Sequence, residues 1–365
     1  MGSTMTSHPY KSLPSHTRWY RAVSTIAPNA FDPVIDFPFV IGKDDKVATA
    51  GSCFAQHIAR HMRMRGFSYF VVEQGHFLAS DAILSEFQYS TYSARYGNVY
   101  TSRQLKQLFE RAYGSTAYDL EAWPLGEGRY ADPFRPTIQP KGFASLAELN
   151  ADRAQHLSQV RRMFEELDYF VFTLGLTECW FDRKTGAALP ICPGVSGGEY
   201  SDDTTGFINL SVAEVVADMK EFLHNLAQVN PRARVILTVS PVPLAATALN
   251  RHVVTSTVYS KSVLRVAAEE ITTAFPHVAY FPSFEVITAG PSAGRYFAED
   301  KRSVLEDGVK HVMGLFFKHA TDSNATNTAS DTSPQRTSAD EGRASIEAMK
   351  GVVQVLCDEE LTARG

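Results

Sequence analysis

Two side chains that could act as nucleophiles, Ser52 and Cys53, are adjacent in the segment VATAGSCFA (residues 47–55). The apolar residues before Gly51 predict a buried strand, and an amphipathic helix is predicted from about Phe54 to Arg65. The two side chains therefore lie at a strand-to-helix turn, where free N–H groups and the helix dipole favour a thiolate, an alkoxide or an oxyanion. The structural alternative is equally plain: Ser is a preferred helix N-cap, and Cys is often a small buried hydrophobic residue.

Further apolar runs predict strands, and long helical patterns separate them, among them residues 103–113 and 212–229. The runs are FSYFVV (67–72), YFVFTLG (169–175), RVILTVSP (234–241) and VAYFPS (278–283). Continuous apolar strands that alternate with helices predict an α/β fold, with a five-stranded parallel sheet covered by helices on both faces. Ligands of such sheets bind at the carboxyl ends of the strands. We therefore expect GSC (51–53), GLTE (175–178), SPVP (240–243) and PSFE (282–285) to share one rim.

The remaining segments suggest one large domain with appended ends. We expect a flexible N-terminus over residues 1–18, a single domain over 19–319, a disordered linker over 320–343 and an amphipathic C-terminal helix over 344–365. The first irregular insertion, 123–143, is predicted to form a lid or binding loop or else to wrap the surface, and the second, 181–207, is predicted to cap the rim.

The composition of the 365-residue chain excludes several classes of protein. The net charge of -5 provides no basic stripe for nucleic acid, and no apolar stretch reaches the length of a membrane span. The four cysteines show no C-x-x-C spacing, so neither a disulfide framework nor a zinc site is expected. These features favour a cytoplasmic protein without a metal site or cofactor.

Five segments resemble the GSCFA domain family: GSCFAQHIA, TLGLTECW, VSPVPL, YSKSVLR and YFPSFEV. The resemblance extends from about residue 19 to 319. That family is grouped with the SGNH (GDSL-like) hydrolases, so it implies a three-layer α/β/α, flavodoxin-like fold with a parallel sheet and an esterase or acyltransferase site.

The resemblance assigns the nucleophile. The Gly-Asp-Ser-Leu block of the SGNH hydrolases falls on Gly51, Ser52, Cys53 and Phe54, which places Cys53 at the nucleophile position. A slip of one residue would instead select Ser52. We favour Cys53 because Phe54 then matches the apolar residue of the block, and because a thiol at a helix N-terminus can ionise without a strong base. On this basis Cys53 should be the most reactive cysteine.

The same pattern also predicts the oxyanion donors. The Gly-x-Asn-Asp block falls on Gly175, Leu176, Thr177 and Glu178, so the Thr177 hydroxyl or backbone N–H groups would replace the Asn amide. Glu178 would orient a histidine, bind a polar substrate group or form an ion pair. Gly97, with Asn98, is the best match for the donor glycine, although Gly-Asn is also an ordinary turn signal.

The last SGNH block, Asp-x-x-His, departs from the pattern. It aligns Asp300 with the Asp and places Ser303 where the catalytic histidine stands. Either another imidazole acts as the base, with His311, then His252, then His57 as candidates, or the hydrolytic triad has been lost.

Two cations could hold an anionic group of a ligand. Lys261 lies in YSKSVLR, which resembles a segment of the family, and Arg135 in the first insertion could clamp a carboxylate or phosphate bidentately. For Lys261 the alternative is a solvated helix face.

Two functions remain open. The first is an acyl esterase or acyltransferase that forms a covalent acyl-enzyme on a polar, carbohydrate-linked substrate, with a small molecule or glycan and an acyl thioester donor as partners. The second is a non-catalytic module that keeps the fold and binds a glycan or acyl ligand.

Overall fold

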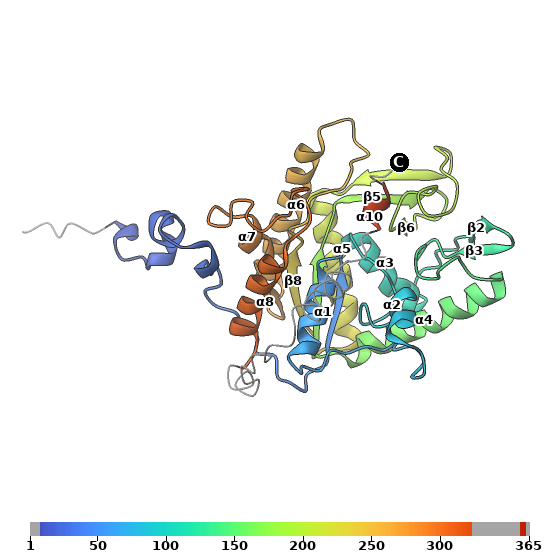
Figure 1. The fold of residues 1–365 in the computed structure, drawn as a ribbon, viewed down its shortest axis with the longest axis horizontal. Helices are drawn as coiled ribbons and strands as arrows, with labels where there is room; N and C mark the ends of the chain where they lie inside the picture. The colour runs from blue at the N-terminus through green and yellow to red at the C-terminus, as the bar shows by residue number, and fades with distance from the viewer. Residues whose placement is uncertain (1–7, 323–357, 363–365) are drawn as a thin grey trace, which may run out of the picture.

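A parallel sheet, of which β8 is labelled in Figure 1, forms the centre of the molecule. Its strands have the order β1-β4-β8-β9. The structure is a computed structural model that describes residues 8–322 and 358–362. Within this part of the chain the sheet contains four strands: β1 (Val47–Gly51), β4 (Tyr169–Leu174), β8 (Arg234–Val239) and β9 (Val278–Tyr280). All three pairings are parallel, and every residue of β1 and β4 is buried. The continuous apolar runs of the sequence arise from this burial on both faces.

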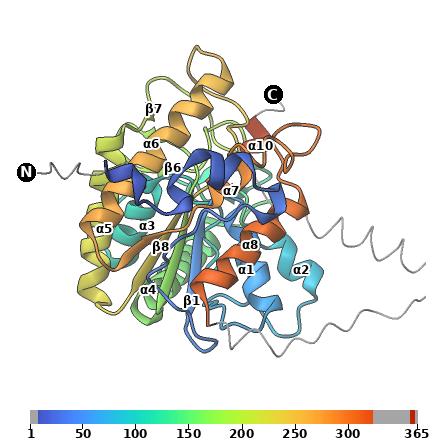
Figure 2. The same ribbon diagram turned by 90° about the vertical axis from the view of Figure 1, so that its left-hand side faces the viewer.

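Alternate residues of the strands face two separate apolar cores, which makes a three-layer α/β/α arrangement. Phe170 and Phe172 pack into the first core, whereas Tyr169 and Val171 pack into the second. The helices α3 (Ser102–Tyr113), α4 (Leu146–Glu166), α5 (Val212–Val229) and α6 (Val253–Ala274) cover the first face. The helices α1 (Ala55–Met64), α7 (Ser283–Thr288) and α8 (Glu306–Ala320) cover the second. Figure 2 shows α3, α4 and α5 on one side of β1 and β8, with α1 and α8 on the other.

Local sequence signals fix the ends of several helices. Thr101 and Gln104 form a reciprocal capping box at the start of α3, and Ser211 and Glu214 form another at the start of α5. Gly114 ends α3 in the left-handed conformation, with a φ of 65°. These signals explain why the predicted bounds of α3 and α5 agree closely with the observed ones.

The expected fifth strand is the main difference from the predicted sheet. Only the beginning of the FSYFVV run pairs with β1, through a bridge between Val47 and Tyr69. Further along, Ser93 enters the gap, since its side chain accepts from the Thr49 N–H and its carbonyl accepts from the Val72 N–H. The prediction of five strands is therefore wrong for the described residues, because a later segment competes for the same edge of β1.

Both insertions contain short antiparallel sheets. A hairpin of β2 (Trp123–Gly126) and β3 (Arg129–Ala131) lies in the first. The second contributes to a sheet with the strand order β6-β5-β7. These strands are β6 (Ala188–Leu189), β5 (Glu178–Asp182) and β7 (Thr205–Asn209). The expectation of irregular loops was wrong for these strands, because their charged and Gly-rich residues mask a weak strand signal.

Buried ion pairs join the first insertion to α4. Asp132 is fully buried and accepts hydrogen bonds from Arg135 at 2.9 Å and from Arg153 at 2.8 Å. Arg135 also reaches Asp152 on α4, at 2.7 Å. The two arginines keep the pKa of the Asp132 carboxyl group well below its usual range, although burial alone would raise it.

The chain ends contribute short elements. The N-terminal part carries 3-10 helices at Pro9–Lys11, Ser15–Thr17 and Pro28–Ala30 and one π-helical turn at Tyr20–Ser24. Within the domain, a short helix, α2 (Asp81–Glu86), follows α1. At the other end the structure describes one short helix, α10 (Glu359–Thr362). The expected linker, apart from its first residues, and most of the expected C-terminal helix lie outside the described residues. Over residues 8–322 and 358–362, every helix is too short or too polar to traverse a bilayer.

Candidate active site at the carboxyl edge of the sheet

The GSC turn extends β1 into α1 in a conformation that requires glycine. Gly51 has a φ of +141°, and a Cβ at this position would lie 2.5 Å from the Thr173 carbonyl oxygen. The next N–H, that of Ser52, still pairs with Thr173 at 3.2 Å. The Ser52 side chain is 3% exposed, and its hydroxyl has no hydrogen-bond partner in the described part of the chain. The turn therefore places Ser52 and Cys53 at the carboxyl end of the sheet, as expected.

Cys53 is buried, with 3% exposure, and it is disulfide-bonded. Its partner lies outside the described residues, in which Cys179 and Cys192 are free thiols. The expectation that the cysteines form no disulfide is therefore wrong at Cys53. Sequence spacing did not reveal the bridge, because a disulfide depends on which residues the fold brings together. A thiolate at this position requires prior reduction of the bond.

The loop of residues 97–100 lies between the ends of β1 and β4. The Val99 N–H donates to the Gly51 carbonyl at 2.9 Å, and the N–H groups of Gly175 and Leu176 both donate to the Tyr100 carbonyl at 3.0 Å. Gly97 adopts a φ of +69° in this loop. The structure thus brings Gly97 and Asn98 close to the GSC turn, although the role of either as an oxyanion donor remains a prediction.

The residues of the Gly-x-Asn-Asp block have structural partners. The Thr177 hydroxyl donates to Asn209 at 2.6 Å. The Glu178 carboxylate accepts from the Thr247 hydroxyl at 2.5 Å and from the Ala248 N–H at 3.0 Å, so in this structure it binds the loop after β8. A cavity of about 230 Å³ lies beside it and is lined in part by Leu176, Trp180, Cys192, Leu244 and Thr362.

The two predicted anion-binding cations differ in position. Lys261 is buried at the rim and donates to the Gly175 carbonyl at 2.7 Å, so it supports the turn after β4. Arg135 is held by Asp132 of the first insertion and by Asp152 of α4. The structure therefore does not bring Arg135 to the rim with the GSC turn.

Asp300 and Ser303, which the sequence aligns with the last SGNH block, contact each other directly. The Ser303 hydroxyl and N–H both donate to the Asp300 carboxylate, at 2.5 Å and 2.9 Å. These bonds, with that from the Arg302 N–H, lower the pKa of the exposed Asp300 carboxyl group. The assignment of Asp300 and Ser303 to an Asp-x-x-His position remains a prediction.

The three candidate bases each have other contacts. His311 pairs with the Tyr296 hydroxyl at 2.9 Å, and it also bonds to the backbone of Phe31. His252 caps α6 by accepting from the Val254 N–H at 3.2 Å. His57 is buried, and burial together with the nearby Arg60 lowers its pKa to about 4. Their role as a general base remains a prediction, and their contacts are structural ones.

The C-terminal residues 358–362 contact the rim through pairs of residues that the sequence did not identify. The Asp358 carboxylate accepts from Asn98 Nδ2 and from Thr137 Oγ1, both at 3.0 Å. Glu360 pairs with Arg302 at 3.1 Å. No local motif marks either contact, because both join segments that are far apart in the chain.

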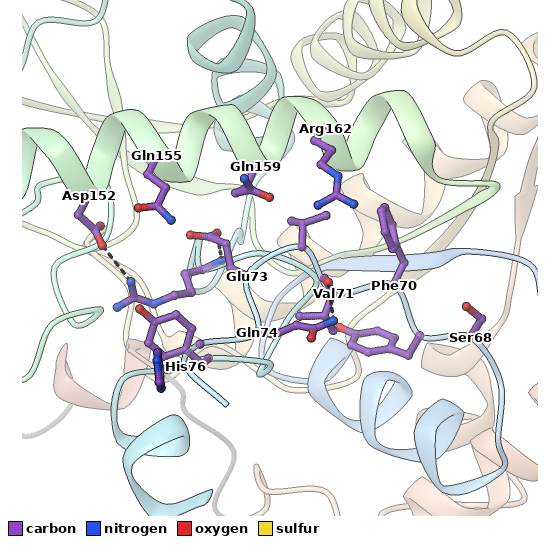
Figure 3. Close-up of a pocket in the computed structure, with 15 residues that line it drawn as sticks. Ser68, Phe70, Val71, Glu73, Gln74, His76, Asp152, Gln155, Gln159 and Arg162 are labelled. Atoms are coloured by element: carbon purple, nitrogen blue, oxygen red, sulfur yellow. Dashed lines mark hydrogen bonds and ion pairs between the residues drawn. The ribbon is translucent and has the colours of Figure 1, made fainter. Parts of the chain in front are cut away.

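A larger cavity, of about 810 Å³, lies at the side of the molecule between α4 and residues 68–76 (Figure 3). Asp152, Gln155, Gln159 and Arg162 point into it from one face of α4. Its charged groups are paired, since Glu73 lies 2.8 Å from His156 and Arg95 lies 3.0 Å from Asp152. None of the predicted site residues lines this cavity.

Comparisons with known proteins agree with the sequence resemblance. The GSCFA family model matches residues 46–316. No curated protein matches the chain. Two solved structures are similar to parts of it. A carbohydrate esterase family 2 enzyme with a carbohydrate binding domain, from Corynascus thermopiles (Myceliophthora fergusii), is 11% identical, with 78% of this chain and 68% of that chain covered and a TM-score of 0.26. An acetyl xylan esterase from the rumen bacterium Butyrivibrio proteoclasticus is 13% identical, with 68% of this chain and 57% of that chain covered and a TM-score of 0.23.

Proposed function

Because the chain belongs to the GSCFA family, we propose that it transfers acyl groups at the GSC turn, as an esterase or acyltransferase acting on a polar, carbohydrate-linked substrate. The observation that carries this proposal is the meeting of three segments at the carboxyl edge of the sheet. The GSC turn at the start of α1 is bonded to the Gly97 loop, and that loop is bonded to the turn after β4. This edge is the usual ligand site of a parallel α/β sheet.

The proposed nucleophile is the thiolate of Cys53 after reduction. A dithiol supplies two electrons and two protons to the disulfide and becomes a disulfide itself. The sulfur then attacks the acyl carbonyl, a C–S bond forms, and the carbonyl electron pair moves to the oxygen. Backbone N–H groups of Cys53 and Gly97 stabilise this oxyanion. The oxyanion collapses, the ester C–O bond breaks, and the leaving alkoxide takes a proton from water. Water or an acceptor hydroxyl then attacks the thioester carbonyl and gives its proton to solvent, and the C–S bond breaks to release the acyl product and the Cys53 thiolate.

A matched set of variants tests this proposal. We expect hydrolysis of a short-chain aryl ester only after reduction with dithiothreitol, and a loss on the order of 10²-fold or more in Cys53→Ala. Ser52→Ala should keep most of the activity, and Cys192→Ala, which removes a free thiol, is the control. Loss in Ser52→Ala with full activity in Cys53→Ala would transfer the role of nucleophile to Ser52.

A second function is favoured by Ser303 and by the structural contacts of the three candidate histidines. A site without a general base could bind a glycan or acyl ligand without turnover. Calorimetric titration with an acetylated xylo-oligosaccharide, followed by analysis of the recovered sugar, separates the two functions. Binding with the ester intact, in reduced protein, would support the binding module.

A further inference from the structure

The C-terminal segment Asp358–Thr362 lies across the rim and contacts three of its loops. Asp358 is bonded to Asn98, in the loop beside the GSC turn. Glu360 is paired with Arg302, next to Ser303. Thr362 lines the cavity of Leu176 and Glu178. The helix α10, to which it belongs, is drawn beside β5 in Figure 1. A segment of five residues therefore spans the region where we place the acyl-transfer site.

The Asp358 carboxyl group occupies a subsite built for an oxygen acceptor. It is 7% exposed, and two donors, Asn98 Nδ2 and Thr137 Oγ1, contact its two oxygens. Burial raises the pKa of this carboxyl group, so its position is costly and depends on the two hydrogen bonds.

The donors of this subsite are themselves held in place. Gln56 of α1 donates to the Tyr92 hydroxyl at 2.9 Å, and the Tyr92 hydroxyl donates to Asn98 Oδ1. This orients the Asn98 amide so that its NH₂ group faces Asp358. The arrangement would present the same two donors to any other oxygen acceptor that entered.

We propose that residues 358–362 form an intramolecular strap that closes the site, with Asp358 seated in the Asn98–Thr137 subsite, where a carbonyl or carboxylate oxygen of the substrate binds. The identity of the competing oxygen rests on the proposed acyl-transfer function, whereas the closure itself does not. Substrate and strap then exclude each other from the subsite.

Hydrogen exchange of the full-length protein tests the closure directly. The comparison is made in dithiothreitol, so that the disulfide of Cys53 does not contribute. Asp358→Ala and Thr137→Val should each raise the exchange rate of the amides of residues 358–362 at least tenfold, while those of α5 stay unchanged. Glu165→Gln, which alters an exposed ion pair on α4, is the control. Equal protection in all four proteins would overturn the strap.

Ester hydrolysis then distinguishes the strap from the proposed function. If both proposals hold, Asp358→Ala should lower the KM for an aryl ester about tenfold or more relative to reduced wild type. Faster exchange without turnover in any protein would support the strap and contradict acyl transfer. If Asp358→Ala loses the activity of the wild type because kcat falls, and KM is not lowered, the strap is overturned and Asp358 is assigned to catalysis.

Discussion

The Asp300 carboxylate accepts a 2.5 Å hydrogen bond from the hydroxyl of Ser303, three residues later in the chain. The sequence alignment predicts a histidine at position 303, and the hydroxyl found there cannot take up a proton near neutral pH. The same loop contacts the C-terminal segment through Arg302 and Glu360. Position 303, where the alignment predicts an imidazole, is therefore the place to test whether the site lacks a general base.

Introducing the imidazole should increase ester hydrolysis. In Ser303→His, Asp300 can orient and stabilise the new ring, and a positioned general base contributes on the order of 10²-fold. We expect an increase of about that size in aryl ester hydrolysis by reduced protein. The double variant Asp300→Asn with Ser303→His should lose most of the gain. No increase over wild type would mean that residue 303 does not face the nucleophile.

Alkylation should distinguish the cysteines by their bonding state. Without reductant, we expect iodoacetamide to label Cys192 first, because it is partly exposed. Cys179 should react slowly, since burial raises the pKa of its thiol to about 11. Cys53 should react only after dithiothreitol, which revises the expectation that it is the most reactive cysteine. Peptide mapping of the labelled protein measures all three, and rapid labelling of Cys53 without reductant would contradict the disulfide.

A methyl group at Gly51 should be strongly destabilising. It would force a side chain into a positive-φ conformation and against the Thr173 backbone at 2.5 Å. We expect Gly51→Ala to reduce the free energy of unfolding by roughly 3 kcal/mol or more. Gly314→Ala, on the exposed face of α8 with nothing within 4 Å, should instead be stabilising by up to ~1 kcal/mol. Urea unfolding measures both, and a neutral Gly51→Ala would contradict the turn geometry.

His57 should make the protein less stable in acid. Its pKa falls from 6.5 in the unfolded chain to about 4 in the folded protein, so the unfolded chain binds more protons between these values. Stability should therefore decrease as the pH falls from 6.5 to 4, by about 3 kcal/mol from this residue. His57→Gln should remove that part of the slope in urea unfolding, whereas His16→Gln, at an exposed position, should not. An unchanged slope in His57→Gln would refute the assignment.

The sequence predicted the fold well wherever burial was continuous. The strands YFVFTLG and RVILTVSP and the capped helices α3 and α5 have strong local signals, and the structure contains them within a few residues of their predicted bounds. The run FSYFVV has the same apolar character, yet it pairs with β1 only at Tyr69, because Ser93 occupies the next position along the edge. Competition between two segments for one strand is decided by tertiary contacts, which a local pattern does not contain.

The sequence predicted only those site residues whose positions follow from local signals. The residues that follow strands, such as Gly51 and Gly175, lie at the rim because strand direction alone places them there. Asp358 and Thr137 could not be found in this way, since neither follows a strand of the central sheet and their contact joins positions 221 residues apart. The disulfide of Cys53 could not be predicted from the sequence either, because only the folded chain determines which cysteines meet.

The salt bridges of Asp132 mean that the first insertion cannot be treated as a replaceable loop. The charges of a mobile lid would be in water when the lid is open. Separating Arg135 from Asp132 and Asp152 would instead leave buried charged groups without their partners. Because Thr137 belongs to this rigid insertion, the floor of the oxygen subsite is set when the chain folds. Engineering of substrate preference should therefore vary the C-terminal residues and leave the insertion intact.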